Sequence, residues 1–220
     1  MFSLSEENYL KAIFHLEKKT NAVVSTNSLA EEMESKASSV TDMLKKMADK
    51  DLVIYKKYKG VRLSKLGKET AIQIIRKHRL WEVFLVEKLN FSWDEVHDVA
   101  EQLEHIKSKK LIAELDQFLG CPKLDPHGDP IPDENGNFSV LQKTILKNLE
   151  RGEIGVFIGV KNSSTEFLQY LDKNKIALGE KIKVVEKEAF DGSMQICLEN
   201  NELVNISEQV TENLYIKQDL

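Results

Sequence analysis

The 220-residue sequence contains two cysteines and four prolines, and it has no long hydrophobic run. Cys121 and Cys197 lie far apart without CxxC spacing, which excludes a disulfide framework and favours free thiols in a reducing compartment. No apolar stretch approaches the roughly 18 residues that a membrane-spanning helix needs, and the N-terminus lacks the regions of a signal peptide. We therefore expect a cytoplasmic protein with no membrane partner.

The sequence also lacks the short motifs of common hydrolases, because it contains neither HExxH nor a phosphate-binding loop. A metallohydrolase built from its histidines and glutamates is the alternative, and it would need an open coordination position and a substrate pocket. We expect no enzyme and no small organic substrate.

Charge is unevenly distributed along the chain, whose formal net charge is −5. Between Lys36 and Lys68, ten Lys and Arg residues against three Asp residues give a net charge of +7, so the remaining residues total −12. Such segregation indicates a polyanionic partner for one part of the molecule.

The first 65 residues have the element order of a winged helix-turn-helix. Apolar periodicity predicts a helix over 5–19 with Ser5 as its N-cap, a short helix near 27–33, and a third helix capped by Ser38 or Ser39. Two short β runs between residues 52 and 63 follow and form a basic hairpin. Helix, short helix, turn, helix and hairpin together predict a DNA-binding winged helix.

A second helix of interest covers residues 96–106, where apolar side chains recur at three- and four-residue spacing. His97, Glu101, Glu104 and His105 form another stripe on this predicted helix. Two imidazoles and two carboxylates on one side of a helix can bind a divalent metal ion. The alternative is a solvated acidic face on which the two glutamates weakly repel each other.

The rest of the chain divides at a proline-rich connector. A long helix from Ser64 to about Leu89 is apolar on several sides, which is typical of a domain or subunit interface. All four prolines lie between Pro122 and Pro132, which places a domain boundary within 120–142. Short strand patterns and one helix follow, as in a small SH3-like barrel.

The predicted fold is therefore mainly α with a small β domain. We expect a winged-helix DNA-binding domain over 1–65, a helical domain with the proline-rich connector over 66–142, and an SH3-like barrel over 143–220.

Several motifs occur in one order along nearly the full length. They are Leu63-Ser64-Lys65-Leu66-Gly67, Arg76-Lys77-His78-Arg79-Leu80, Val96-His97-Asp98, Glu104-His105 and Asp125-Pro126-His127-Gly128-Asp129-Pro130. In these motifs and their order the chain resembles the diphtheria-toxin-repressor family, which includes the manganese transport regulators. The resemblance implies a homodimeric, divalent-metal-activated repressor of double-stranded operator DNA, with a helical domain that both dimerises and binds metal.

The resemblance also implies a regulatory metal site made of Glu101, Glu104 and His105. Its fourth ligand would be Asn8, where the family usually has Met or Asp, with Glu7 as the alternative. An amide oxygen can coordinate a hard cation but brings no charge.

Further implied metal ligands lie in three parts of the chain. They are His78 and Glu82, one helical turn apart, with His97; Asp125 and His127 of the connector; and Glu166 of the C-terminal domain. Lys11 stands where some manganese regulators have another carboxylate, so we do not expect their close pair of metal ions.

The resemblance implies two sets of DNA contacts. The recognition helix would meet bases and phosphates through Ser38, Ser39, Thr41 and Asp42, and the phosphate contacts would come from Lys36, Lys45, Lys56, Lys57 and Lys59. Metal binding would join the first helix to the helical domain and so position two recognition helices one DNA turn apart on a palindrome.

The predicted cofactor is Mn²⁺, with Fe²⁺ as the alternative. In iron-responsive members of the family the position of Glu101 is a cysteine, and oxygen ligands suit Mn²⁺ better than a thiolate does. Three other readings stay open: an iron-dependent repressor of the same family, a metal-independent winged-helix interaction module, and a metal store, which would usually be richer in Cys and His.

Overall fold

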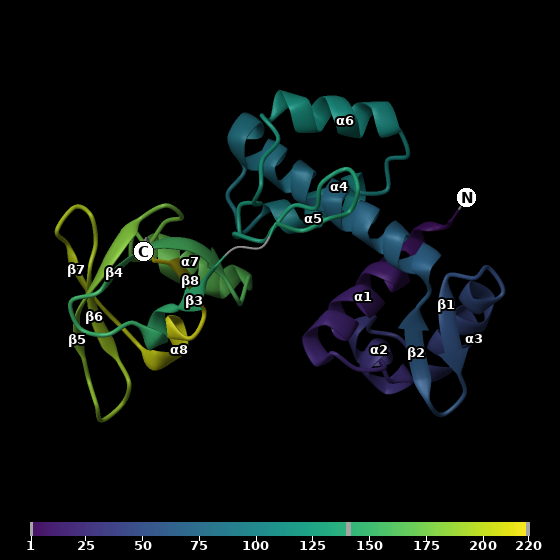
Figure 1. Cartoon of the computed structure of the whole chain (residues 1–220), viewed down its shortest axis with the longest axis horizontal. Helices are drawn as coiled ribbons and strands as arrows, with labels where there is room; N and C mark the ends of the chain where they lie inside the picture. The colour runs from purple at the N-terminus through teal and green to yellow at the C-terminus, as the bar shows by residue number, and fades with distance from the viewer. Residues whose placement is uncertain (1, 140–141, 219–220) are drawn as a thin grey trace. The chain divides into compact units, whose positions relative to one another are not determined.

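The structure is a computed structural model that describes residues 2–139 and 142–218. Its contacts divide the chain into two units, which are described separately. The first unit holds the chain up to His78 with residues 101–109 and 132–137, and the second holds residues 79–100, 110–131 and the chain from Phe138 onward. Figure 1 shows the course of the chain through its helices and strands.

The first unit begins with three helices and a two-stranded antiparallel hairpin. These are α1 (Leu4–Thr20), α2 (Thr26–Glu32), α3 (Ala37–Ala48), β1 (Val53–Lys56) and β2 (Gly60–Leu63). Buried side chains from the helices and the hairpin, among them Leu10, Leu29 and Leu44, make their common core. Helix, helix, helix and hairpin is the winged helix-turn-helix order that the sequence predicts (Figure 1).

Two helix starts differ from the prediction. Ser3, rather than Ser5, caps α1, because Ser3 and Glu6 satisfy each other's backbone N–H groups in a capping box. The third helix begins two or three residues earlier than expected, with Lys36 at its N-cap and no side-chain cap. Ser38 and Ser39 therefore lie inside the first turn of α3, where both are exposed.

Three helices follow the hairpin: α4 (Lys65–Leu89), α5 (Val96–Leu103) and α6 (Lys109–Phe118). Ser64 accepts a hydrogen bond from the backbone N–H of Gly67 at 3.0 Å, and α4 begins and ends where the sequence predicts. None of the helices in the described ranges is long and apolar enough to cross a bilayer.

The prediction that Glu104 and His105 lie on the helix of His97 was wrong. The helix α5 ends at Leu103, and the backbone N–H of Ile106 donates to the carbonyl of Leu103 in a turn. The side chain of Glu104 is fully buried rather than on a solvated face, since its oxygens have cationic partners described below.

The C-terminal part of the second unit is a six-stranded antiparallel sheet with two short helices. The strands are β3 (Thr144–Ile145), β4 (Ile154–Val160), β5 (Lys181–Lys187), β6 (Met194–Cys197), β7 (Leu203–Ile206) and β8 (Leu214–Lys217), in the order β3-β8-β4-β5-β6-β7. A 3₁₀ turn (Leu146–Asn148), α7 (Thr165–Lys173) and α8 (Glu208–Thr211) complete this part.

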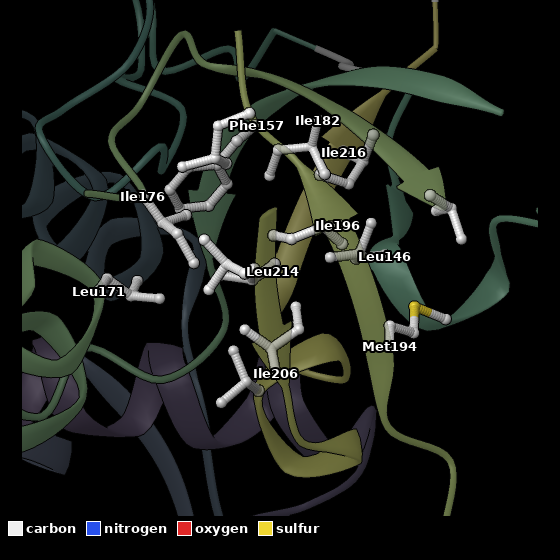
Figure 2. Packing of buried hydrophobic residues seen from close by; sticks show 14 of the residues in the cluster. Leu146, Phe157, Leu171, Ile176, Ile182, Met194, Ile196, Ile206, Leu214 and Ile216 are labelled. Atoms are coloured by element: carbon white, nitrogen blue, oxygen red, sulfur yellow. The ribbon is translucent and has the colours of Figure 1, made fainter. Parts of the chain in front are cut away.

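The sheet curves around one apolar core, part of which Figure 2 shows. Phe157, Ile196 and Leu214 are among its fully buried members. A mainly α chain with a small β domain is confirmed, although the sequence did not predict β3, α8 or β8. Val140 and Leu141, inside the predicted boundary region, lie outside the described residues, so the three domain boundaries stay predictions.

Candidate metal centre

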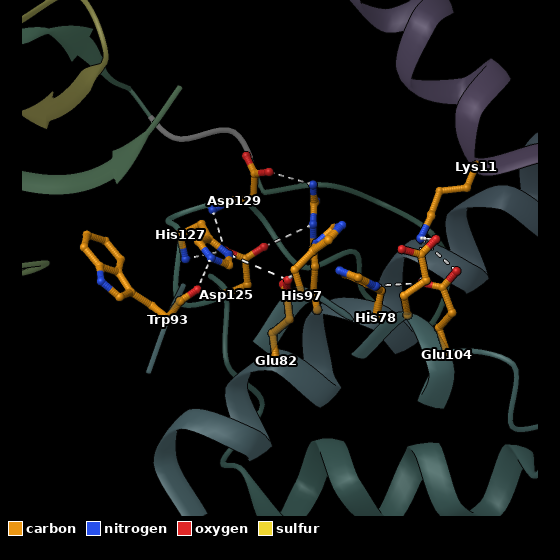
Figure 3. A network of polar contacts seen from close by, with 11 residues as sticks. Lys11, His78, Glu82, Trp93, His97, Glu104, Asp125, His127 and Asp129 are labelled. Atoms are coloured by element: carbon orange, nitrogen blue, oxygen red, sulfur yellow. Dashed lines mark hydrogen bonds and ion pairs between the residues drawn. The ribbon is translucent and has the colours of Figure 1, made fainter. Parts of the chain in front are cut away.

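Three potential metal ligands converge within the second unit, on α4 and on the connector. Glu82 comes from α4, and Asp125 and His127 come from the connector; their ligand atoms all lie within 4.8 Å of one another, and all three residues are buried. His127 Nδ1 is 3.7 Å from Glu82 Oε1 and 4.0 Å from Asp125 Oδ1. We call these three residues the Glu82 group (Figure 3).

Trp93 fixes the orientation and the tautomer of His127. The Nε2 atom of His127 lies 2.7 Å from the backbone carbonyl of Trp93, so Nε2 carries a proton and donates it. The indole of Trp93 stacks on the imidazole, with the rings 8° from parallel. The Nδ1 atom therefore faces the two carboxylates, as a ligating histidine requires.

Arg79 orients Asp125 from the other side. Its Nε atom is 3.3 Å from Asp125 Oδ2, and its guanidinium also reaches Asp129 Oδ2 at 3.0 Å and the carbonyl of Pro130. Asp125 Oδ1 accepts backbone hydrogen bonds from His127 and Asp129, which hold the connector in a tight loop. The carboxylate is thus positioned by groups that do not themselves ligate metal.

The charges of the Glu82 group are strongly coupled. Burial, reinforced by the Glu82 carboxylate and opposed by Arg79, raises the pKa of Asp125 to about 7. Burial opposes the charging of His127, but the carboxylates of Glu82 and Asp125 outweigh it and raise the pKa of His127 to about 9. At neutral pH, His127 therefore carries a second proton, on the Nδ1 atom that faces the carboxylates. A divalent cation that bound to Nδ1 would have to displace this proton.

His97 and Glu166 are the other predicted ligands in this unit. His97 Nδ1 lies 3.6 Å from Glu82 Oε1, and its side chain is 61% exposed, so it lies at the edge of the Glu82 group. Glu166 is exposed in the first turn of α7 and is not among the clustered ligand atoms of the described residues. Its role as a ligand stays a prediction.

The first unit holds a second cluster, built around Glu104. Lys11 Nζ on α1 is 2.8 Å from Glu104 Oε1 and 3.3 Å from Glu101 Oε1. His78 Nδ1 is 2.6 Å from Glu104 Oε2. Burial opposes ionisation of Glu104, but the hydrogen bond with His78 and the charge of Lys11 hold its pKa below the usual value. We call Lys11, Glu101 and Glu104 the Lys11 group (Figure 3).

The remaining predicted ligands lie beside this group. His105 Nδ1 is 2.6 Å from Glu7 Oε2, and its Nε2 is 3.9 Å from Glu104 Oε1. Asn8 Oδ1 is buried and has no hydrogen-bond partner among the described residues. Lys11 thus lies beside both Glu101 and Glu104, and His105 lies beside Glu104. The prediction that His78 joins Glu82 and His97 stays a prediction.

The predicted DNA contacts are nearly all on the surface of the winged helix. Thr41 is half-buried and donates its hydroxyl proton to the carbonyl of Ala37, and Lys45 pairs with Asp42 at 3.1 Å. The exposed members are Lys36, Ser38, Ser39, Asp42, Lys45, Lys56, Lys57 and Lys59.

Sequence reasoning missed several residues of these sites. It assigned no role to Arg79, Trp93 or Asp129, although Arg79 and Asp129 occur in the motifs that the chain shares with the family. It also missed Tyr58, which is 92% exposed at the tip of the hairpin, with Lys57 Nζ 4.9 Å from its ring centre. An aromatic residue among lysines was the available signal for Tyr58.

Comparison with known proteins adds three domain matches. An iron dependent repressor N-terminal DNA binding domain matches residues 1–61, and an iron dependent repressor metal binding and dimerisation domain matches residues 64–133. A FeoA domain matches residues 145–218.

Solved structures are similar over the whole chain. A manganese-dependent transcriptional repressor in complex with manganese is 31% identical, with a TM-score of 0.82 over 97% of this chain and 99% of its own. The chain belongs to the diphtheria-toxin-repressor family of metal-dependent transcriptional repressors. The manganese regulator SloR, another member, is 33% identical, with a TM-score of 0.71 over 97% of this chain and 98% of its own.

Curated members of the family match over a shorter range. The iron-dependent repressor IdeR of Mycobacterium leprae is 32% identical over 126 residues, which are 57% of this chain and 54% of that protein. The chain thus spans about half the length of the curated relatives it matches. The family is one of transcriptional repressors and not of enzymes.

The connector that carries Asp125 and His127 is held against strand β4 by two glycines. The backbone N–H of Val160 donates to the carbonyl of His127 at 2.9 Å. A Cβ atom on Gly128, whose φ is +83°, would lie 1.9 Å from the carbonyl oxygen of Ile158 and 2.3 Å from the Cα of Gly159. A side chain at residue 128 would therefore push this part of the connector, which we call the ligand loop, away from the sheet.

We predict that Gly128→Ala loosens this loop more than Gly179→Ala does. Gly179 has a similar φ of +87° but open space around a Cβ, so the control shares the backbone strain without the clash. The clash should cost about 1–3 kcal/mol beyond the strain. Hydrogen exchange of the Val160 amide measures it, and equal exchange in the two variants would show that the close contact does not hold the loop.

Proposed function

We propose that this chain is a divalent-metal-dependent transcriptional repressor that binds palindromic operator DNA as a homodimer, with Mn²⁺ preferred over Fe²⁺. The observation that carries the proposal is the Glu82 group, three buried ligands aimed at one another in a chain that also has a basic winged helix. Proteins with these two features on one polypeptide can link cation binding to DNA binding.

The Glu82 group fits a divalent cation. It offers carboxylate oxygens and one imidazole whose tautomer is already set. Arg79 and Trp93 hold Asp125 and His127 in place through Oδ2 and Nε2, and they leave Nδ1 of His127 facing the carboxylates. A bound divalent cation would supply the positive charge that two buried carboxylates need. His97, at the edge, or water could complete the coordination.

The ligand chemistry favours Mn²⁺ and leaves Fe²⁺ as the competitor. Oxygen-rich sites suit Mn²⁺, and neither cysteine lies in the Glu82 group, since Cys121 is exposed and Cys197 is in strand β6. Affinity alone would rank Fe²⁺ and Zn²⁺ above Mn²⁺ at almost any such site. Selectivity would therefore have to lie in activation. Manganese-dependent and iron-dependent repressors both occur among the relatives.

The helix α4 offers a physical connection between the ligands and the DNA-binding hairpin. It begins two residues after β2 and carries Glu82 about five turns later on the same continuous helix. The guanidinium groups of Arg76 and Arg79 also bind the carbonyls of Pro132 and Pro130, so the connector is fastened along α4. A change in the conformation of the connector would therefore be felt by α4, the helix that follows the hairpin in the chain.

A homodimer is supported by the match of residues 64–133 to a dimerisation domain. Large apolar side chains on α4 and α6 are exposed in the single chain, with Leu89 at 51%, Leu111 at 40% and Phe118 at 65% exposure. Exposed apolar side chains gathered on helices are typical of subunit interfaces. Two copies would present two recognition helices to one palindrome.

The first prediction of the proposal concerns the ligands. Glu82→Gln and His127→Ala should each weaken Mn²⁺ binding more than about 100-fold, because losing only an outer partner of a metal ligand already costs about 10–100-fold. Both variants should also lose Mn²⁺-dependent operator binding. Glu87→Gln, the same change at an exposed site on α4, should behave as wild type.

The measurement is an anaerobic titration of operator binding with each ion at buffered free concentration. Wild type should respond most strongly to Mn²⁺, with Zn²⁺ bound but not fully activating. A response to Fe²⁺ but not to Mn²⁺ would make the manganese assignment wrong, and operator binding that needs no metal would favour the metal-independent interaction module.

The second prediction concerns the hairpin. Replacing both Lys57 and Lys59 by Ala should weaken binding to all DNA sequences alike and should lower the salt slope by about one unit for each lost phosphate contact. The control replaces Lys109 and Lys110, exposed residues of α6, and removes the same charge elsewhere. An unchanged slope in the hairpin variant would mean that the hairpin does not touch DNA.

A further inference from the structure

The Lys11 group already contains a cation. Lys11 Nζ lies within 2.9 Å of one oxygen and 2.8 Å of the other oxygen of Glu104, and 3.3 Å from Glu101. The Lys11 side chain is only 14% exposed and that of Glu104 is fully buried. The ammonium thus sits between two carboxylates, as an ion held by them would (Figure 3).

The ammonium and a divalent metal ion need the same oxygens. A metal ion bound by Glu101 and Glu104 would lie beside Nζ in a buried site, where like charges repel strongly and water screens them little. Either Lys11 would have to leave its two partners, or the metal ion would have to bind without them. The residues of this cluster therefore fit a divalent ion poorly while Lys11 is in place.

The carboxylates of the cluster already have partners without metal. Lys11 pairs with Glu101 and Glu104, and the imidazoles of His78 and His105 contact Glu104 and Glu7. Lys77 adds a further positive charge near Glu7 and Glu104. Buried carboxylates in proteins are stable when such partners are present.

Asn8 is a feature of this cluster that favours a metal ligand. Its buried Oδ1 has no hydrogen-bond partner in the described part of the chain; Glu104 Oε1 also lacks one, but it forms the 2.8 Å ion pair with Lys11. An amide oxygen is neutral, so it does not offset the charge of Lys11. It would become a useful ligand only if the ammonium were removed.

We propose that the Lys11 ammonium is the resident cation of this cluster, so that α1 is fastened to the segment after α5 without metal. The Glu101, Glu104 and His105 cluster then binds no divalent ion in the wild type, and the Glu82 group is the metal site of the chain. The statement that the Glu82 group is the metal site rests on the proposed function. The statement that Lys11 replaces a metal ion does not. Removing the charge of Lys11 should open a second site in which Asn8 joins Glu101, Glu104 and His105.

The test counts Mn²⁺ ions bound per full-length chain after equilibrium dialysis of metal-free protein. Wild type should bind one ion, and Glu104→Gln should still bind one. Lys11→Met, which keeps the length of the side chain, should bind two, and adding Glu104→Gln to it should return the count to one. Lys19→Met, the same change at an exposed position of α1, should bind one.

The fastening of α1 has its own measurement. Amides of α1 should exchange faster in metal-free Lys11→Met than in Lys19→Met, and Mn²⁺ should slow that exchange again in Lys11→Met alone. Lys11→Gln serves the same tests if Lys11→Met does not fold.

Two results would overturn the inference: any wild-type ion, whether the first or a second, that Glu104→Gln removes, or a Lys11→Met variant that folds and gains no ion. Failure of the proposed metal centre looks different. In that case wild type binds no ion, or its one ion survives Glu82→Gln, while the gain of one ion in Lys11→Met still supports the role of Lys11.

Discussion

The arrangement of this protein depends on the need of buried carboxylates for a positive charge. Glu82, Glu104 and Asp125 are all buried, and a buried carboxylate without a cationic partner is very costly. The first unit meets this need with the Lys11 ammonium, and the second meets it with Arg79 and the imidazolium of His127. In the proposed metal centre of the second unit the charge could be exchanged for a metal ion, because a proton can leave His127 and Arg79 contacts Oδ2 of Asp125.

The two clusters therefore have different proposed roles, since one holds a fixed lysine and the other holds a proton that a metal ion could replace. A lysine side chain is part of the protein at every metal concentration, so a link made by Lys11 does not depend on metal. A site that must exchange a proton for a cation responds to metal concentration instead. The helix α4 and the connector carry the ligands of the proposed metal centre, and the close contact of Gly128 with β4 makes the C-terminal sheet part of its support. The FeoA domain would thus contribute by holding the ligand loop, whether or not Glu166 is itself a ligand.

Much of the fold followed from local sequence signals, since the long helix, the hairpin and four of the strands come directly from apolar periodicity. The missed strand β3 has only two residues, which is too short for a pattern. The missed strand β8 is as long as β6 and β7 and alternates in burial, so the signal was present there and was overlooked. The placement of the site residues was harder. Glu104 was predicted on a helix face, but its burial depends on Lys11 and His78, which are distant in sequence. Lys11 looked like a simple departure from the family pattern, and only its contacts reveal it as the partner of Glu104.

The most direct test of the account is a crystal structure of the full chain grown with Mn²⁺, with the ion located by its anomalous scattering. We predict one strong peak per chain, bonded to Glu82, Asp125 and His127, with Lys11 still between Glu101 and Glu104 and no peak there. A peak bonded to Glu101 and Glu104 with Lys11 displaced, and none at Glu82, would contradict it.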